Sequence, residues 1–157
     1  MDGDRTLATA AARLIDPPLG RASDAALLLT RVVLGAFLIW GVWDNIISAE
    51  RMAEFTGFLA LHGFAWPAFM ARLSVYAQFL VGLSFVAGLG VRWAGLVCAF
   101  NFAVAVAMVD AKLGVRGAFP ATALILFGLI LAAVGGGGFS VDQIVRRSRA
   151  AQPAKNI

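Results

Sequence analysis

The chain has little of what soluble enzymes and redox proteins ordinarily use. It holds one cysteine, Cys98, and one histidine, His62, among its 157 residues. A lone cysteine excludes an internal disulfide and a cysteine-ligated cluster, and a lone histidine excludes a haem held between two histidines of this chain. The sequence also lacks a phosphate-binding loop, a zinc-ligand spacing and a nucleophilic triad. We therefore expect no catalytic residue, no metal site and no covalently held cofactor.

Charged residues are scarce as well. They make up 14% of the chain, whereas 61% is hydrophobic, and the mean hydropathy is +0.84. A soluble domain is about a quarter charged and under half apolar, so this composition argues against a soluble fold. The net charge is +4, but the basic residues flank apolar segments and form no patch with interleaved aromatic residues. This pattern indicates contact with a lipid bilayer and excludes a nucleic-acid partner.

Four long apolar stretches fill most of the chain. They cover residues 25–47, 67–89, 93–113 and 118–136. Each reaches or approaches the ~20 residues that an α-helix needs to cross a bilayer core. The sequence therefore predicts an all-α fold, an integral membrane four-helix transmembrane bundle within residues 24–138. The very short connection at 88–92 predicts that the second and third spans form an antiparallel hairpin.

The segments outside the spans have different patterns. Residues 48–66 place Met52, Phe55 and Phe58 on one side of a helix and charged residues on another, which predicts a short amphipathic helix between the first two spans. Residues 1–23 would form an N-terminal arm, either a surface helix or a disordered segment. Residues 139–157 would form a basic tail, preceded by a flexible glycine turn.

The distribution of basic residues predicts the orientation in the membrane. Four spans put both termini on one side, and that side would hold nine of the 13 lysines and arginines. The positive-inside rule then predicts cytoplasmic N- and C-termini in a bacterial-type inner membrane. The nine are Arg5, Arg13, Arg21, Arg31, Arg92, Arg146, Arg147, Arg149 and Lys155.

A few polar residues interrupt the spans, and each needs a physical reason. A charge at the centre of a membrane helix costs about 2.5–3.5 kcal/mol. Arg31 either extends to the interface or is buried against an acid, a quinone or a lipid head group. It shares one helix face with Gly35 and Asn45. These two polar groups and the glycine should meet the bundle.

Two amides lie in the middle of the second and third spans. Gln78, on a helix stripe with Ser74, and Asn101 are about equally far from the turn, so they can meet across the hairpin. An amide cannot stay unsatisfied in hydrocarbon, so each either joins helices or binds a ligand. The candidate binding residues on the polar face are Arg31, Asn45, Gln78 and Asn101.

Asp44 ends the first span, where its charge opposes the helix dipole unless a cation is close. A solvated helix end is one interpretation. The other is an ion pair, and Arg72 is the first partner to consider.

Four segments, in order, resemble DoxX-type membrane proteins. They are LLTRVVLGAFL at 28–38, FTGFLALHGFAWPAFMARL at 55–73, YAQFLVGLSFVAGLGVR at 76–92 and GGFSVD at 137–142. The resemblance covers about residues 25–142. It implies a four-helix integral membrane protein of a family often linked to oxidoreductase complexes, including a thiosulfate:quinone oxidoreductase subunit.

The sequence departs from that family at three positions. Gln78 stands where the family usually has a glutamate, Asp44-Asn45 where a lysine is usual, and Ala121-Thr122 where a glutamate is common. The resemblance thus implies a non-catalytic subunit or accessory factor of a quinone-linked redox complex, with quinone as a possible ligand and other redox subunits as partners. The alternative is a small transporter, or a lipid- or quinone-binding protein acting on its own.

Overall fold

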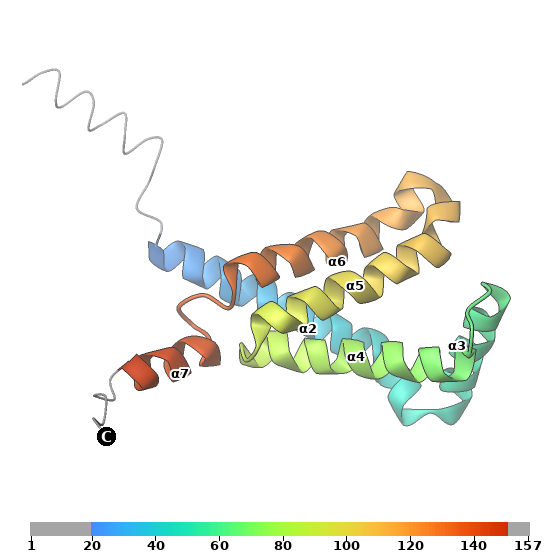
Figure 1. The fold of residues 1–157 in the computed structure, drawn as a ribbon, viewed down its shortest axis with the longest axis horizontal. Helices are drawn as coiled ribbons and strands as arrows, with labels where there is room; N and C mark the ends of the chain where they lie inside the picture. The colour runs from blue at the N-terminus through green and yellow to red at the C-terminus, as the bar shows by residue number, and fades with distance from the viewer. Residues whose placement is uncertain (1–19, 151–157) are drawn as a thin grey trace, which may run out of the picture.

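The structure is a computed structural model that describes residues 20–150 (Figure 1). Its elements are α2 (Gly20–Ile47), α3 (Ala49–Leu61), α4 (Pro67–Ala87), α5 (Val91–Met108), the 3₁₀ helix η1 (Asp110–Leu113), α6 (Gly114–Val134) and α7 (Val141–Ala150). Most of the expected N-terminal arm and the end of the tail lie outside the described residues.

Within residues 20–150, four helical segments are long and apolar enough to cross a membrane: α2, α4, α5 and the η1–α6 segment. The predicted all-α membrane bundle is therefore confirmed, and α3 lies where the amphipathic helix was expected. Some boundaries differ. The third span ends at Met108 and continues as η1, because Val109 leaves the helical conformation with φ −122°. The fourth begins at Gly114, before the expected residue 118, and includes Pro120.

The four spans pack as two close pairs, α2 with α4 and α5 with α6 (Figure 1). Glycines face each other where each pair crosses. A Cβ atom on Gly35 would lie 2.6 Å from the Gly82 carbonyl oxygen, and one on Gly128 would lie 2.7 Å from the Gly95 carbonyl oxygen. Small residues at such crossings let helix backbones approach within membranes, where apolar burial alone gives little attraction.

A three-residue turn joins the two pairs through α4 and α5. Gly88 and Gly90 adopt φ angles of 73° and 63°, which glycine tolerates without strain. Beside this turn the four spans share one apolar core. It contains Leu38, Val81, Phe85, Val91, Ala94, Cys98 and Leu131. Away from the turn the pairs diverge (Figure 1).

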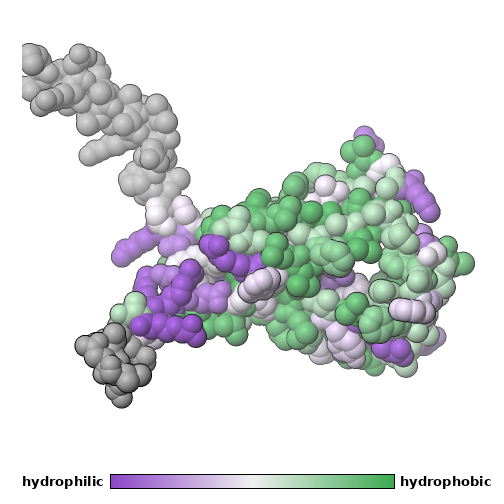
Figure 2. Space-filling model, in the orientation of Figure 1, coloured by the Kyte–Doolittle hydropathy of each residue, from purple (hydrophilic) through white to green (hydrophobic). Residues whose placement is uncertain are grey.

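The two ends of the bundle therefore differ. We call the end with the α4–α5 turn, the start of α2 and α7 the latch end, and the end with α3 and η1 the cavity end (Figure 1). Figure 2 shows apolar surface along the spans and hydrophilic residues gathered toward the ends. Trp40 and Trp66 are 84% and 77% exposed on the cavity-end half. Exposed indoles suit the boundary between lipid and water.

Candidate functional site

Arg31 is the most deeply buried charged side chain among the described residues, with 0% of its surface exposed. Its Nη1 donates to the Phe85 carbonyl oxygen at 3.2 Å, and its Nη2 donates to the Phe139 carbonyl oxygen at 2.7 Å. The Phe85 carbonyl belongs to the last turn of α4, where carbonyls lack helical partners and the dipole is negative. Arg31 therefore caps α4 and ties it to the chain after α6.

Asp142 plays the opposite role at the start of α5. Its carboxylate accepts hydrogen bonds from the Gly90 N–H at 2.8 Å and the Val91 N–H at 3.1 Å, while its own N–H donates to the Gly88 carbonyl at 3.0 Å. These are two of the free N–H groups at a positive helix terminus. Asp142 also attracts the Arg31 guanidinium electrostatically. The α4–α5 turn thus lies between a cation at one helix terminus and an anion at the other.

The segment 135–142, which we call the clasp, brings these contacts together. Asp24 of α2 accepts the Gly138 N–H at 2.6 Å. The Ser140 hydroxyl donates to the Gly137 carbonyl at 2.7 Å and accepts the Gln143 N–H at 3.3 Å, which starts α7. A Cβ on Gly136 would lie 2.6 Å from that of Ser140. The glycines of the turn predicted to be flexible make close contacts, Gly136 with Ser140 of the clasp and Gly137 and Gly138 with Asp24 of α2.

At the cavity end, the diverging pairs leave a lateral cavity of about 690 Å³ between α3, α4 and α5. Its walls are mostly apolar and aromatic. They include Phe55, Phe58, Leu59, Phe64, Met70, Leu73, Phe100, Val104 and Met108. Asp110 lies at its edge on η1. Cavities of ~300–1,000 Å³ with apolar walls and few polar groups are typical ligand sites.

Three neutral polar side chains line one side of the lateral cavity. The Ser74 hydroxyl donates to Asn101 Oδ1 at 2.9 Å, and Gln78 Nε2 donates to the Ser74 oxygen at 3.1 Å. Ser74 thus joins Gln78 and Asn101, which the sequence expected to pair directly. We call these three residues the amide cluster. Each is half-buried, and all three line the lateral cavity.

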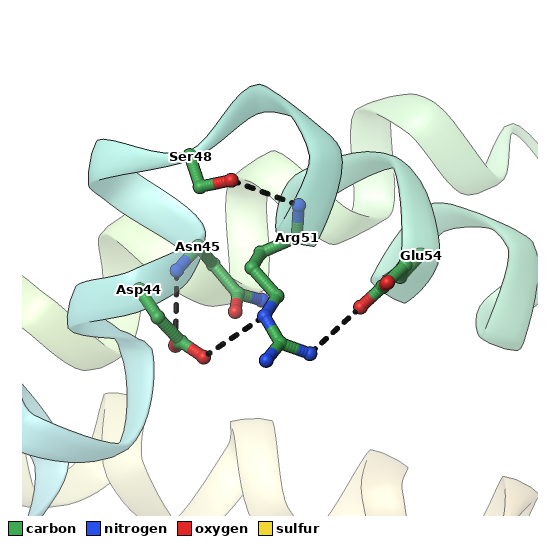
Figure 3. Close-up of polar contacts among 5 residues, drawn as sticks. All are labelled: Asp44, Asn45, Ser48, Arg51 and Glu54. Atoms are coloured by element: carbon green, nitrogen blue, oxygen red, sulfur yellow. Dashed lines mark hydrogen bonds and ion pairs between the residues drawn. The ribbon is translucent and has the colours of Figure 1, made fainter.

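A second hollow of about 480 Å³, which we call the vestibule, lies between α2, α3 and α4. Its charged rim is shown in Figure 3, where the Arg51 side chain extends between Asp44 and Glu54. Arg51 Nη1 donates to Glu54 Oε2 at 3.0 Å, and its Nε lies 3.9 Å from Asp44 Oδ2. Asn45 and Gln78 line the hollow deeper in.

Asp44 therefore has a different cation partner from the expected one. We predicted a pair with Arg72, but Asp44 contacts Arg51, which lies in the first turn of α3. Arg72 instead donates to the Ala68 carbonyl of its own helix at 3.3 Å. The chain reverses at Ser48, whose hydroxyl accepts the Arg51 N–H at 3.3 Å and so brings Arg51 back toward the end of α2.

The structure separates the four candidate binding residues into two groups. Gln78 and Asn101 meet at the lateral cavity, and Asn45 joins Gln78 in the vestibule. Arg31 lies at the latch end, among backbone carbonyls. Sequence reasoning missed Asp142 and the aromatic wall of α3. A signal for the first was present, since Ser140-Val141-Asp142 after a glycine run is typical of a capped helix start.

The fold defines a multi-pass membrane protein with four spans and a lateral cavity at one end. The DoxX family model matches residues 26–111, which is more than half of the chain, so the protein belongs to the DoxX family. The match includes every residue that lines the lateral cavity, whereas the clasp lies outside it. No curated protein and no solved structure matches the chain.

Proposed function

We propose that this DoxX-family protein is an accessory, non-catalytic membrane subunit that holds an isoprenoid quinone, or a lipid of similar build, in the lateral cavity. The observation that carries the proposal is the cavity itself, about 690 Å³ with aromatic walls and the amide cluster on one side. Aromatic and aliphatic walls suit an isoprenoid chain, and a few neutral polar groups fix the orientation of a ring carrying carbonyl oxygens.

The proposed role in a redox complex rests on the family, whose members are often linked to oxidoreductase complexes. The chain itself supplies one cysteine and one histidine, so electrons would enter and leave through cofactors of partner subunits. We place the latch end in the cytoplasm, because Arg92, Arg146, Arg147 and Arg149 lie there. The lateral cavity then opens within the outer leaflet.

A second candidate is a lipid- or quinone-binding protein that acts on its own. It is favoured by one observation, that helices α3, α4 and α5 of one chain together line the lateral cavity. Purification in mild detergent separates the two candidates. Co-purifying redox subunits support the first, and a lone protein that retains a small amphiphile supports the second.

The binding experiment uses the full chain in lipid nanodiscs and a short-chain quinone as the probe. We expect saturable binding that Asn101→Leu weakens by roughly tenfold, corresponding to the loss of about 1.4 kcal/mol. Arg72→Gln is the matched control, because Arg72 points to its own helix and lines neither hollow. Equal affinity of wild type and Asn101→Leu would contradict the assignment of the amide cluster.

A topology reporter tests the orientation separately. A reporter that is active only in the cytoplasm should be active when it is fused after Ile157, and a reporter that is active only outside the cytoplasm should be inactive there. An active extracytoplasmic reporter would overturn the placement of the lateral cavity in the outer leaflet, while leaving the binding proposal open to the quinone measurement.

A further inference from the structure

The lateral cavity and the vestibule share a wall. Phe55, Phe58 and Gln78 line both hollows, so these three side chains contribute to a wall that the hollows share. The phenyl rings lie 6.3 Å apart, centre to centre, at an interplanar angle of 16°. One hollow is apolar and lies between the spans, and the other has a charged rim at the cavity end. An apolar hollow next to a more polar one matches the two ends of an amphiphile.

The polar groups at this shared wall are uncharged. Gln78 is an amide, and the neighbouring amide cluster adds a hydroxyl and a second amide. Arg51 supplies the cation of the vestibule, and it is already held by two carboxylates at 3.0 and 3.9 Å. The lateral cavity adds another carboxylate, Asp110. A phosphate head group would therefore meet carboxylates without an uncommitted cation from the lining residues, and burying such a charge is costly.

The hydrogen bonds within the amide cluster leave both donors and acceptors free to bind a ligand. Gln78 donates through Nε2 and keeps Oε1 as an acceptor, while Asn101 accepts through Oδ1 and keeps two N–H donors on Nδ2. A head group that accepts at one position and donates at another can satisfy both residues. Carbonyl and hydroxyl oxygens on a small ring meet this requirement without charge.

We propose that the vestibule and the lateral cavity are two halves of one site for an amphiphile with an uncharged, hydrogen-bonding head group. This inference rests on the proposed function and adds the head-group class and its position. The chain of the amphiphile occupies the lateral cavity, and its head group lies at the shared wall beside Gln78. The vestibule opens that head group to water at the cavity end, so water-soluble molecules reach it without entering the bilayer.

Thiol labelling tests the water access, because the chain has one cysteine. In a Cys98→Ala background in nanodiscs, a charged maleimide that does not enter lipid is applied to three single-cysteine variants. Asn45→Cys reports on the vestibule, Gln78→Cys on the shared wall and Ala105→Cys on the lateral cavity alone. We expect the Gln78→Cys rate to be within about tenfold of the Asn45→Cys rate, with Ala105→Cys slower by at least another factor of about ten.

Phe58→Ala in the same background should speed the labelling of Gln78→Cys several-fold, since it removes one ring of the shared wall. A Gln78→Cys thiol that reacts with a lipid-soluble maleimide but not with the charged one would overturn the proposal, because the shared wall would then be closed to water.

Protection by ligands tests the head-group class on Phe55→Cys in the same background, because Phe55 lines both hollows and its replacement keeps the amide cluster intact. A saturating short-chain quinone should slow Phe55→Cys labelling at least fivefold, and nanodiscs enriched in phosphatidylglycerol should leave the rate unchanged. Equal protection by phosphatidylglycerol would overturn the uncharged head group. If neither probe protects Phe55→Cys while the charged maleimide still reaches Gln78→Cys, the proposed quinone function fails and the ligand assignment fails with it. In that case, the labelling would still show that water reaches the shared wall through the vestibule.

Discussion

The latch end and the cavity end are built from the same four helices, yet they handle polarity in opposite ways. At the latch end, charged side chains bind backbone groups of neighbouring segments: Arg31 binds two carbonyls and Asp142 two N–H groups. At the cavity end, the Ser74 hydroxyl joins two neutral amides, which retain unused donors and acceptors. Charged side chains bonded to the backbone hold neighbouring segments together. Neutral groups with unused donors and acceptors remain available to a ligand.

The difference also locates where the molecule can change shape. α4 and α5 are tied at their turn through Gly88, Gly90 and the clasp, and they diverge toward the lateral cavity. Movement of one helix pair against the other would therefore pivot at the latch end and appear mainly at the cavity end. Glycine crossings keep each pair rigid, because the backbones are in contact there.

The largest expected effect comes from breaking the latch at Arg31. Arg31→Ala leaves two carbonyls without their donor and opens a void in the core, which should lower the free energy of unfolding by about 3 kcal/mol or more. Arg31→Lys should recover part of the loss, since a single ammonium cannot span both carbonyls as the guanidinium does. Denaturation in mixed detergent micelles measures both, and unchanged stability of Arg31→Ala would contradict the latch.

The next effect comes from the glycine crossing of α2 and α4. The methyl group of Gly35→Ala would lie 2.6 Å from the Gly82 carbonyl oxygen, and such overpacking typically costs about 1–3 kcal/mol. Gly41→Ala is the matched control on the same helix, because nothing lies within 4 Å of its Cβ position. Thermal denaturation in detergent should separate the two variants, and equal melting temperatures would show that the pairs are looser than the structure indicates.

A smaller loss is expected when the cap of α5 is removed. Asp142→Ala should cost about 1–2 kcal/mol, because two N–H groups at the helix start lose their acceptor. Asp142→Asn keeps one acceptor oxygen and should cost less. Hydrogen exchange of the Gly90 and Val91 amides gives the most local measurement. Faster exchange at these amides in Asp142→Ala is the expected result, and unchanged protection would argue against the cap.

The smallest effect on stability is expected at the cavity end. Ser74→Ala removes the hydroxyl that joins Gln78 and Asn101 and should cost only about 0.5–1.5 kcal/mol. Its effect on quinone binding should be the larger one, because both amides lose their orientation. A variant with lowered stability and unchanged binding would show that Ser74 serves the fold alone, and would remove the contrast between the two ends.

Much of the fold follows from the sequence, because helix periodicity in a membrane is a strong local signal. Of the residues on the first span expected to meet the bundle, α2 buries Arg31 and Gly35, whereas Asn45 near its end is only partly buried. The stripe that joined Ser74 to Gln78 likewise brings both side chains to one site. Such predictions need only the spacing of residues along one helix.

The clasp and the two hollows depend on features that one helix does not encode. Arg31 binds the carbonyl of a residue 108 positions away, and every residue carries such an acceptor, so no residue type marks the partner. The lateral cavity exists because two helix pairs diverge, which the pattern of a single span does not specify. The Asp44 contact was misassigned because the reversal at Ser48 brings Arg51 closer than any cation on α4.

The most direct test of the account is a pair of distance measurements between spin labels on α4 and α5. In the Cys98→Ala background, one pair of labels sits near the turn at Leu83 and Trp93, and the other sits toward the cavity end at Arg72 and Ala103, which are exposed and do not line the lateral cavity. A short-chain quinone should narrow or shift the distance distribution at the cavity end while leaving the latch end unchanged. An unchanged distribution at both ends, or an equal shift at both, would contradict a fixed latch with a ligand site between diverging helices.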